Sequence, residues 1–217
     1  MELLQQFIEY FLHLDDNLIL LLENYGTWTY AILFLIIFIE TGIVIMPFLP
    51  GDSLLFVAGS FAALGHFNIV YLITLLIIAA ILGDNTNYWI GKFVGDKAIL
   101  WKFRGKPIVN PKYIEKTEKF YDKYGVKTII LARFVPIVRT FAPFVAGVGE
   151  MKYRRFLSYD ILGGILWVSI ATLAGYWFGG MEVVKDNFEL VIVGIIFISI
   201  LPIIIEIAKN KFIIKKS

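Results

Sequence analysis

Four ionisable side chains interrupt otherwise apolar stretches of this 217-residue chain: Glu40, Asp52, Arg133 and Arg139. A charge at the centre of a membrane helix costs about 2.5–3.5 kcal/mol on insertion scales, so such residues pair or serve a function. Guanidinium groups fork onto phosphate oxygens, and a poorly hydrated carboxylate can take up a proton and release an arginine partner. We therefore predict that Arg133 and Arg139 bind phosphate and that Glu40 and Asp52 couple this binding to protons. The alternative is a set of structural ion pairs, since these charges sum to zero.

Asp84 and Tyr88 are secondary candidates. They lie in the segment Gly-Asp-Asn-Thr-Asn-Tyr at residues 83–88, together with Asn87. Because residues separated by three or four positions share a helix face, Asp84, Asn87 and Tyr88 are expected to line one side of a helix. The alternative is a polar seam that only holds packed helices together.

Two more polar residues lie close to the predicted site. Ser53, like Asp52, can cap a helix whose N-terminal dipole favours an anion, and it is also a secondary candidate. Asp160 lies a few residues after Arg154 and Arg155. We expect Asp160 to pair with these arginines at the membrane surface.

The composition indicates a membrane protein and excludes several other classes. The chain is 59% hydrophobic and 18% charged, against about 45–50% and about 25% in soluble domains. Cysteine is absent, which excludes disulfide scaffolds and thiol chemistry, and His13 and His66 are too few for a histidine-rich metal centre. A net charge of +2 does not indicate a nucleic-acid partner. We expect no metal, no cofactor and no enzymatic activity.

Three apolar stretches can each cross a bilayer core, which needs about 20 helical residues: 69–91, 156–180 and 190–208. Two others, 28–64 and 128–149, contain helix-breaking residues. Irregular backbone at membrane depth persists only where protein or a water-filled cavity satisfies it, so we predict re-entrant helix–break–helix hairpins. Kinked ordinary spans are the alternative. The predicted breaking residues are Pro47, Pro50, Gly51, Pro136, Pro143 and Gly147.

The distribution of basic residues predicts the orientation. Half of the 20 Lys and Arg residues lie between Lys92 and Lys127, and most of the others lie at 152–155 or after Ala208. The positive-inside rule places these segments in the cytoplasm. The N-terminus and residues 182–189 are then outside, and the C-terminus is cytoplasmic.

The two halves of the chain resemble each other. Phe-Val-Ala-Gly at 56–59 recurs at 144–147, and the glycine-flanked segment 91–95 corresponds to 175–179, with offsets of 88 and 84 residues. An odd number of spans between the halves would insert the second one upside down. Inverted repeats with broken helices are typical of secondary transporters.

The expected fold is an all-α integral membrane protein with two inverted repeats, each a re-entrant hairpin plus a transmembrane helix. We interpret residues 1–217 as a single membrane domain. Its parts are an amphipathic N-terminal helix (1–27), repeat 1 (28–98), a cytoplasmic linker with a short interfacial helix (99–127), repeat 2 (128–182) and a C-terminal transmembrane helix (188–208).

Two separated motifs resemble those of a known family. Residues 40–52 read E-x₆-P-x₂-P-G-D, and residues 131–147 read L-A-R-F-V-P-I-V-R-T-F-A-P-F-V-A-G. Together with Gly83-Asp84 and Tyr88-x₂-Gly91, they resemble the DedA family of bacterial inner-membrane proteins, in the SNARE-associated, VTT-domain superfamily. The resemblance implies a multi-pass lipid-transporter fold. It also implies that the family's essential acids and arginines correspond to Glu40, Asp52, Arg133 and Arg139.

The resemblance further implies a function. A flippase would move undecaprenyl phosphate, or a related anionic phospholipid, between leaflets at the expense of the proton motive force and so support cell-envelope synthesis. Its partners would be the lipid bilayer, the polyprenyl-phosphate or phospholipid substrate, and protons. The sequence leaves open whether the protein forms a homo-oligomer. The alternative is a proton-coupled small-cation antiporter that uses Glu40, Asp52 and Asp84.

Overall fold

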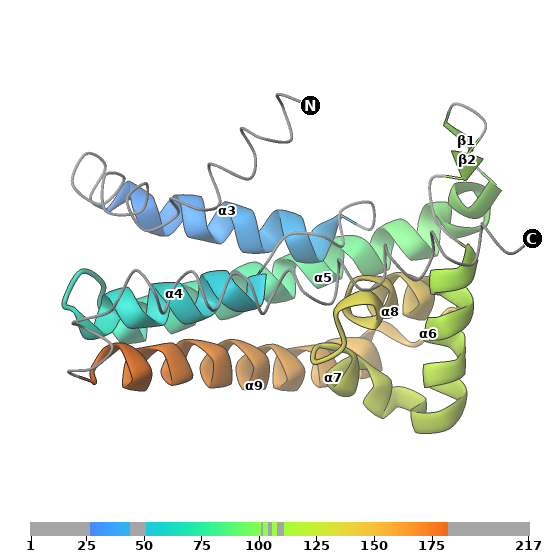
Figure 1. The fold of residues 1–217 in the computed structure, drawn as a ribbon. Coiled ribbons are helices and arrows are strands. Elements are labelled where there is room, and N and C mark those ends of the chain that lie inside the picture. Colours follow the sequence, from blue (N-terminus) through green and yellow to red (C-terminus); the bar gives the residue numbers. More distant parts are fainter. Residues whose placement is uncertain (1–26, 44–50, 101, 104–105, 108–110, 182–217) are drawn as a thin grey trace, which may run out of the picture. The chain divides into compact units, whose positions relative to one another are not determined.

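The computed structural model describes residues 27–43, 51–100, 102–103, 106–107 and 111–181 (Figure 1). Among these residues, one short antiparallel pair, β1 (Lys102–Phe103) with β2 (Lys106–Pro107), accompanies the helices. The prediction of an all-α fold is confirmed for this part of the chain, apart from the β1–β2 pair. The predicted N-terminal helix up to residue 26, with His13, and the predicted C-terminal helix (188–208) lie outside the described residues.

Two helices are long and apolar enough to cross a membrane. They are α5 (Ile69–Leu100), whose apolar part is Ile69–Val94, and α9 (Tyr153–Gly179). The predicted spans 69–91 and 156–180 lie almost entirely within them, and α5 continues beyond its predicted end. Large apolar side chains are exposed on both helices, as expected where lipid is the solvent. They include Val70, Ile78, Leu82, Ile90 and Phe93 on α5, and Leu162, Ile165, Leu166, Ile170 and Trp177 on α9.

The chain forms two compact units, and neither coincides with one predicted repeat. The first unit contains the described parts of 1–31, 50–69 and 171–217, and the second contains those of 32–49 and 70–170. Helix α4 (Gly51–Ala63) lies in the first unit. Most of α3 (Trp28–Gly42) and all of α6 (Pro111–Tyr124), α7 (Thr128–Ala132) and α8 (Pro136–Val148) lie in the second.

In the first unit, α4 packs very closely against residues 171–179 of α9. A Cβ atom at Gly59 would lie 2.0 Å from the carbonyl oxygen of Thr172, and one at Gly175 would lie 1.9 Å from that of Phe56. The Ser60 hydroxyl donates a hydrogen bond to the Gly175 carbonyl at 3.0 Å. Only glycine at these two positions allows the two backbones to approach this closely.

In the second unit, α5 and α8 make an equivalent contact. A Cβ atom at Gly91 would lie 2.2 Å from the carbonyl oxygen of Phe144, and one at Gly147 would lie 2.1 Å from that of Tyr88. These four residues correspond to Gly175, Phe56, Gly59 and Thr172 of the first unit at the offsets noted in the sequence. The predicted repeat therefore has the same type of helix contact in each unit.

The predicted linker helix is present as α6 and packs against α8. Tyr121 donates a hydrogen bond from its hydroxyl to the Ala142 carbonyl at 2.9 Å, and Thr117 is fully buried. Ile114 of α6 packs against the buried aromatic rings of Phe141 and Phe144. A short 3₁₀ helix, Gly125–Lys127, then leads into α7.

Both predicted hairpins contain an interruption, but two residues do not break a helix as expected. Helix α3 ends at Gly42 and α4 begins at Gly51, while Pro47 and Pro50 lie outside the described residues. In the second hairpin, α8 begins at Pro136, and Val135 before it is extended (φ −124°, ψ 101°) because a residue preceding proline disfavours helical geometry. The prediction was wrong for Pro143 and Gly147, which both lie inside α8.

Side-chain donors explain how α8 continues through Pro143. Proline removes one helical N–H group, and membrane helices tolerate this loss where side chains bond the nearby carbonyls. Asn87 donates to the carbonyl of Thr140, in the turn that precedes Pro143, at 2.8 Å. Gly147, for its part, serves the close contact with α5 instead of ending the helix.

We expect Gly91→Ala to destabilise the protein by about 1–3 kcal/mol, because the new methyl group would overlap the Phe144 carbonyl and push α5 from α8. Thermal unfolding of purified protein in detergent measures this loss. Gly180→Ala is the control, since its Cβ atom would keep 3.4 Å from its nearest atoms. Equal unfolding temperatures for the two variants would contradict the close contact.

Candidate functional site

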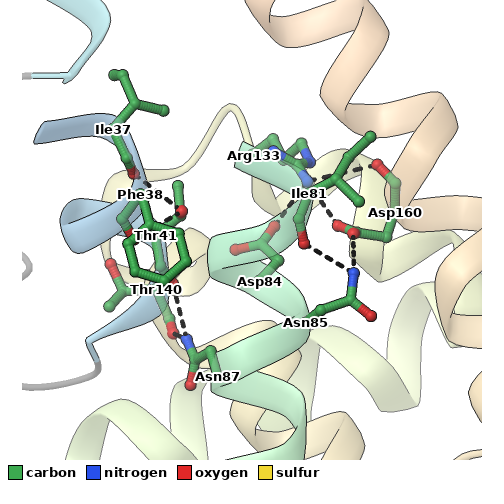
Figure 2. A network of polar contacts seen from close by, with 10 residues as sticks. All are labelled: Ile37, Phe38, Thr41, Ile81, Asp84, Asn85, Asn87, Arg133, Thr140 and Asp160. Atoms are coloured by element: carbon green, nitrogen blue, oxygen red, sulfur yellow. Dashed lines mark hydrogen bonds and ion pairs between the residues drawn. The ribbon is translucent and has the colours of Figure 1, made fainter. Parts of the chain in front are cut away.

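Arg133 lies between two buried carboxylates (Figure 2). Its Nη2 atom is 2.6 Å from Asp84 Oδ2 on α5 and 2.5 Å from Asp160 Oδ1 on α9. Arg133 is 2% exposed and Asp160 is fully buried. The Nε and Nη1 atoms of Arg133 and the Oδ1 atom of Asp84 make no hydrogen bond to any described residue. The guanidinium group of Arg133 therefore binds two carboxylates through one nitrogen atom, and its other two nitrogen atoms make no hydrogen bond to a described residue.

The backbone interruption and two glycines together position Arg133. It is the first residue after α7, in a tight turn that ends where Pro136 starts α8. Its side chain lies against Gly163 and Gly164 of α9, where a Cβ atom at Gly163 would lie only 3.0 Å from Arg133 Cδ and Nε. The missing side chains on α9 leave the room that the arginine occupies.

Arg139 forms an ion pair with an acid of the second unit. From the second turn of α8, its Nη2 atom donates to Glu40 Oε1 on α3 at 2.6 Å. Arg139 is 7% and Glu40 is 3% exposed. An ion pair between these two residues is what the structural alternative to phosphate binding predicts.

Trp167 of α9 lies beside both arginines. Its ring centre is 4.8 Å from Cζ of Arg139 and 5.9 Å from Cζ of Arg133, within the range of cation–π attraction. The side chain is 2% exposed. Trp167 thus joins the two guanidinium groups into one buried cluster, the arginine cluster, with Glu40, Asp84 and Asp160.

The other polar residues of α5 hold helices together. Asn87 donates to the carbonyl oxygens of Thr41 on α3, at 3.1 Å, and of Thr140 on α8, at 2.8 Å (Figure 2). Tyr88 donates its hydroxyl to the Met151 carbonyl and stacks on Phe156. For Asn87 and Tyr88, these contacts favour the alternative interpretation, a row of polar side chains that holds packed helices together.

Asp52 and Ser53 lie in the first unit. Helix α4 begins at Gly51, so both residues belong to its first turn, where Asp52 complements the helix dipole. Asp52 is exposed and Ser53 is buried. The arginine cluster is built entirely from residues of the second unit.

One sequence expectation was wrong and two contributors were missed. Asp160 pairs with Arg133, whereas Arg154 and Arg155 are exposed. The local sequence favoured the neighbouring arginines because it gives no information on contacts 27 residues apart. Trp167 and the Gly163-Gly164 pair were not identified, although two adjacent glycines within an apolar span are a sequence signal for a close approach.

The arrangement can hold an anion or exchange protons. Groups of three or more metal-ligating side chains are absent from the described residues. Guanidinium donors compete for carboxylate and phosphate oxygens, so an incoming phosphate and the three acids of the arginine cluster would be alternatives for the same arginines.

We expect Glu40→Gln to lower the free energy of unfolding by about 3–5 kcal/mol, because Arg139 would remain buried without a compensating charge. The double variant Glu40→Gln/Arg139→Gln removes both charges and should regain most of that stability. Thermal unfolding of the two purified variants gives the comparison. A double variant as unstable as the single one would show that charge compensation is not what Glu40 provides.

Comparisons with known proteins agree on one family. The VTT domain model matches residues 49–177. Protein DedA of Escherichia coli is 54% identical over 213 residues, which cover 97% of this chain and 96% of the relative. An uncharacterized membrane protein of Mycobacterium tuberculosis is 44% identical over 177 residues, covering 81% and 77%.

The name of a more distant relative states that it is an inner-membrane protein. Inner membrane protein YghB of Escherichia coli is 33% identical over 174 residues, which cover 80% of this chain and 77% of the relative. No solved structure matches the chain. The long apolar helices and these relatives identify a bacterial inner-membrane protein, and the chain belongs to the DedA family.

Proposed function

We propose that this protein moves a lipid with an anionic phosphate head group between the leaflets of the inner membrane, driven by the proton motive force. Undecaprenyl phosphate is the substrate that the family resemblance favours, and a related anionic phospholipid is the other substrate of this class. Such transport would return a lipid carrier to cell-envelope synthesis. The observation that carries the proposal is the arginine cluster: two buried guanidinium groups held by acids inside apolar helices.

The arginines support a phosphate substrate more than a purely structural role. Arg133 presents Nε and Nη1 without a hydrogen-bond partner among the described residues, although the side chain is almost fully buried. Unused buried donors are costly, and phosphate oxygens match the fork of a guanidinium group. A lipid phosphate bound there would use donors that the acids leave open.

Acids beside these arginines support proton coupling. A carboxylate that takes up a proton loses most of its attraction for a guanidinium group, so protonation and phosphate binding favour each other. The sequence prediction assigns the proton to Glu40 and Asp52. Moving one charge through 100 mV yields about 2.3 kcal/mol, which is enough to bias the exchange.

Two inverted repeats with re-entrant hairpins would supply the movement. The matched contacts of Gly91 with Phe144 and of Gly175 with Phe56, each within one unit, support the repeat. Small residues at such crossings let the two helix backbones approach closely, so each hairpin helix packs on its span as one unit. Alternating exposure of the arginine cluster to the two leaflets would follow from rocking of one repeat against the other.

A proton-coupled cation antiporter is the second candidate. It is favoured by the charge count of the arginine cluster, in which three acids face two arginines. An antiporter would use this excess negative charge to hold a cation. Cation-dependent proton release by the purified protein, without lipid transfer, would favour it.

We expect Arg139→Lys to slow transport by about tenfold or more, because lysine keeps the charge but loses the planar fork, and each 1.4 kcal/mol corresponds to a factor of ten. The assay is leaflet transfer of labelled undecaprenyl phosphate in proteoliposomes that contain only this protein. Arg154→Lys, at an exposed position, is the matched control. Full transport by Arg139→Lys would reduce Arg139 to a counter-ion of Glu40.

Single cysteines can test the re-entrant hairpins, because the chain has no native cysteine. Thr27 and His66 flank the first hairpin. In intact cells, Thr27→Cys and His66→Cys should both react with a membrane-impermeant maleimide added outside. Lys116→Cys and Glu150→Cys flank the second and should react only after lysis. Labelling of Thr27→Cys and His66→Cys from opposite sides would instead indicate an ordinary kinked span.

A further inference from the structure

We infer that Asp84 and Asp160 hold one proton between them, which makes the group Asp84–Arg133–Asp160 the proton-binding site of this protein. The role of that proton in transport rests on the proposed function, but its presence does not. The inference differs from the sequence prediction, which assigned coupling to Glu40 and Asp52.

Two acids share one arginine at this site. Asp84 Oδ2 and Asp160 Oδ1 both bond to the same Nη2 atom, at 2.6 and 2.5 Å. All three side chains are at least 96% buried, so water does not screen them. One positive charge cannot compensate two negative ones in such a place, and two carboxyl groups that share a site do not both ionise.

The second arginine does not supply the missing charge. Arg139 forms its own ion pair with Glu40 at 2.6 Å, and that pair is neutral by itself. With every acid ionised, the arginine cluster would carry one excess negative charge, whereas a single proton makes it neutral. The unequal number of acids therefore places the proton on the Arg133 side.

The hydrogen bonds around Asp84 agree with a protonated carboxyl group. Asp84 Oδ1 is buried and accepts no hydrogen bond from any described residue. An ionised carboxylate with such an oxygen would bury negative charge without a donor, whereas a proton shared with Asp160 removes that charge from Asp84. Asp160 accepts two bonds from Arg133 and Asn85, so the proton fits better on Asp84.

No further cation faces the acid pair from the described helices around it. The neighbouring titratable or charged groups are Tyr121 of α6, Arg139 of α8, and Tyr153 of α9, which reaches the pair through Asn85. Burial, followed by the charges of Asp84 and Asp160, raises the pKa of Tyr121, so its hydroxyl stays neutral. The proton is thus the remaining way to balance the pair.

This proton sets how firmly Arg133 is held. With one proton on the pair, a single ionised carboxylate holds the guanidinium group, and a lipid phosphate can compete for it. Release of the proton restores the second carboxylate and displaces the phosphate. Proton binding and lipid binding would thereby favour each other without any covalent step.

Infrared spectroscopy of the full-length protein in lipid nanodiscs tests the proton directly. A buried protonated carboxyl group gives a C=O stretching band that shifts in deuterated water. We expect this band at neutral pH in the wild type, and its loss in both Asp84→Asn and Asp160→Asn, since either change leaves one ionised acid for one arginine. Asp122→Asn, at an exposed site of α6, is the control that keeps the band.

The same variants separate this inference from the proposed function. In proteoliposomes, Asp84→Asn and Asp160→Asn should each lose the acceleration of lipid transfer by an imposed pH gradient. If the wild type shows the infrared band but no lipid transfer, the proton site stands and the proposed function fails. A wild type without the band, or a band that persists in whichever Asn variants fold, would overturn the inference.

Discussion

Burying two guanidinium groups among apolar helices is the constraint on which the rest of the second unit depends. Neither Arg133 nor Arg139 can be hydrated where it lies, so each must meet acids that come from other helices. Glu40 from α3, Asp84 from α5 and Asp160 from α9 supply these charges. The position of each of these helices is therefore tied to a charge on the 128–148 segment.

Glycine and proline provide the space that this pairing requires. The interruption before Pro136 puts Arg133 in a turn, and Gly163-Gly164 leaves a gap on α9 that accepts its side chain. At Gly91 and Gly147, α5 and α8 approach until a single methyl group would overlap a carbonyl oxygen. Small residues thus bring polar side chains together in a setting where the hydrophobic effect does not drive helix association.

The two arginines are held differently, which gives them different capacities. Arg139 forms an ion pair with Glu40 and lies over the ring of Trp167. The charges of this pair sum to zero without a proton. Arg133 has two acids on one nitrogen atom and two nitrogen atoms without partners among the described residues, an arrangement that is unbalanced in both charge and hydrogen bonding. The inferred proton exchange therefore lies at Arg133, and Trp167 links this residue to Arg139.

The sequence alone determined the membrane class, the two long helices, the interruption before Pro136 and the four charges that prompted the site, because hydropathy, proline geometry and burial cost are local properties. It also indicated the repeat, whose matching glycines make matching contacts. Only the tertiary structure decided which acid meets which arginine. Asp160 is near Arg154 and Arg155 in sequence but bonds to Arg133, and α8 continues through Pro143 where Asn87 of α5 bonds the Thr140 carbonyl in the preceding turn. Such pairings depend on which faces meet when helices from distant segments pack, and no local pattern contains that information.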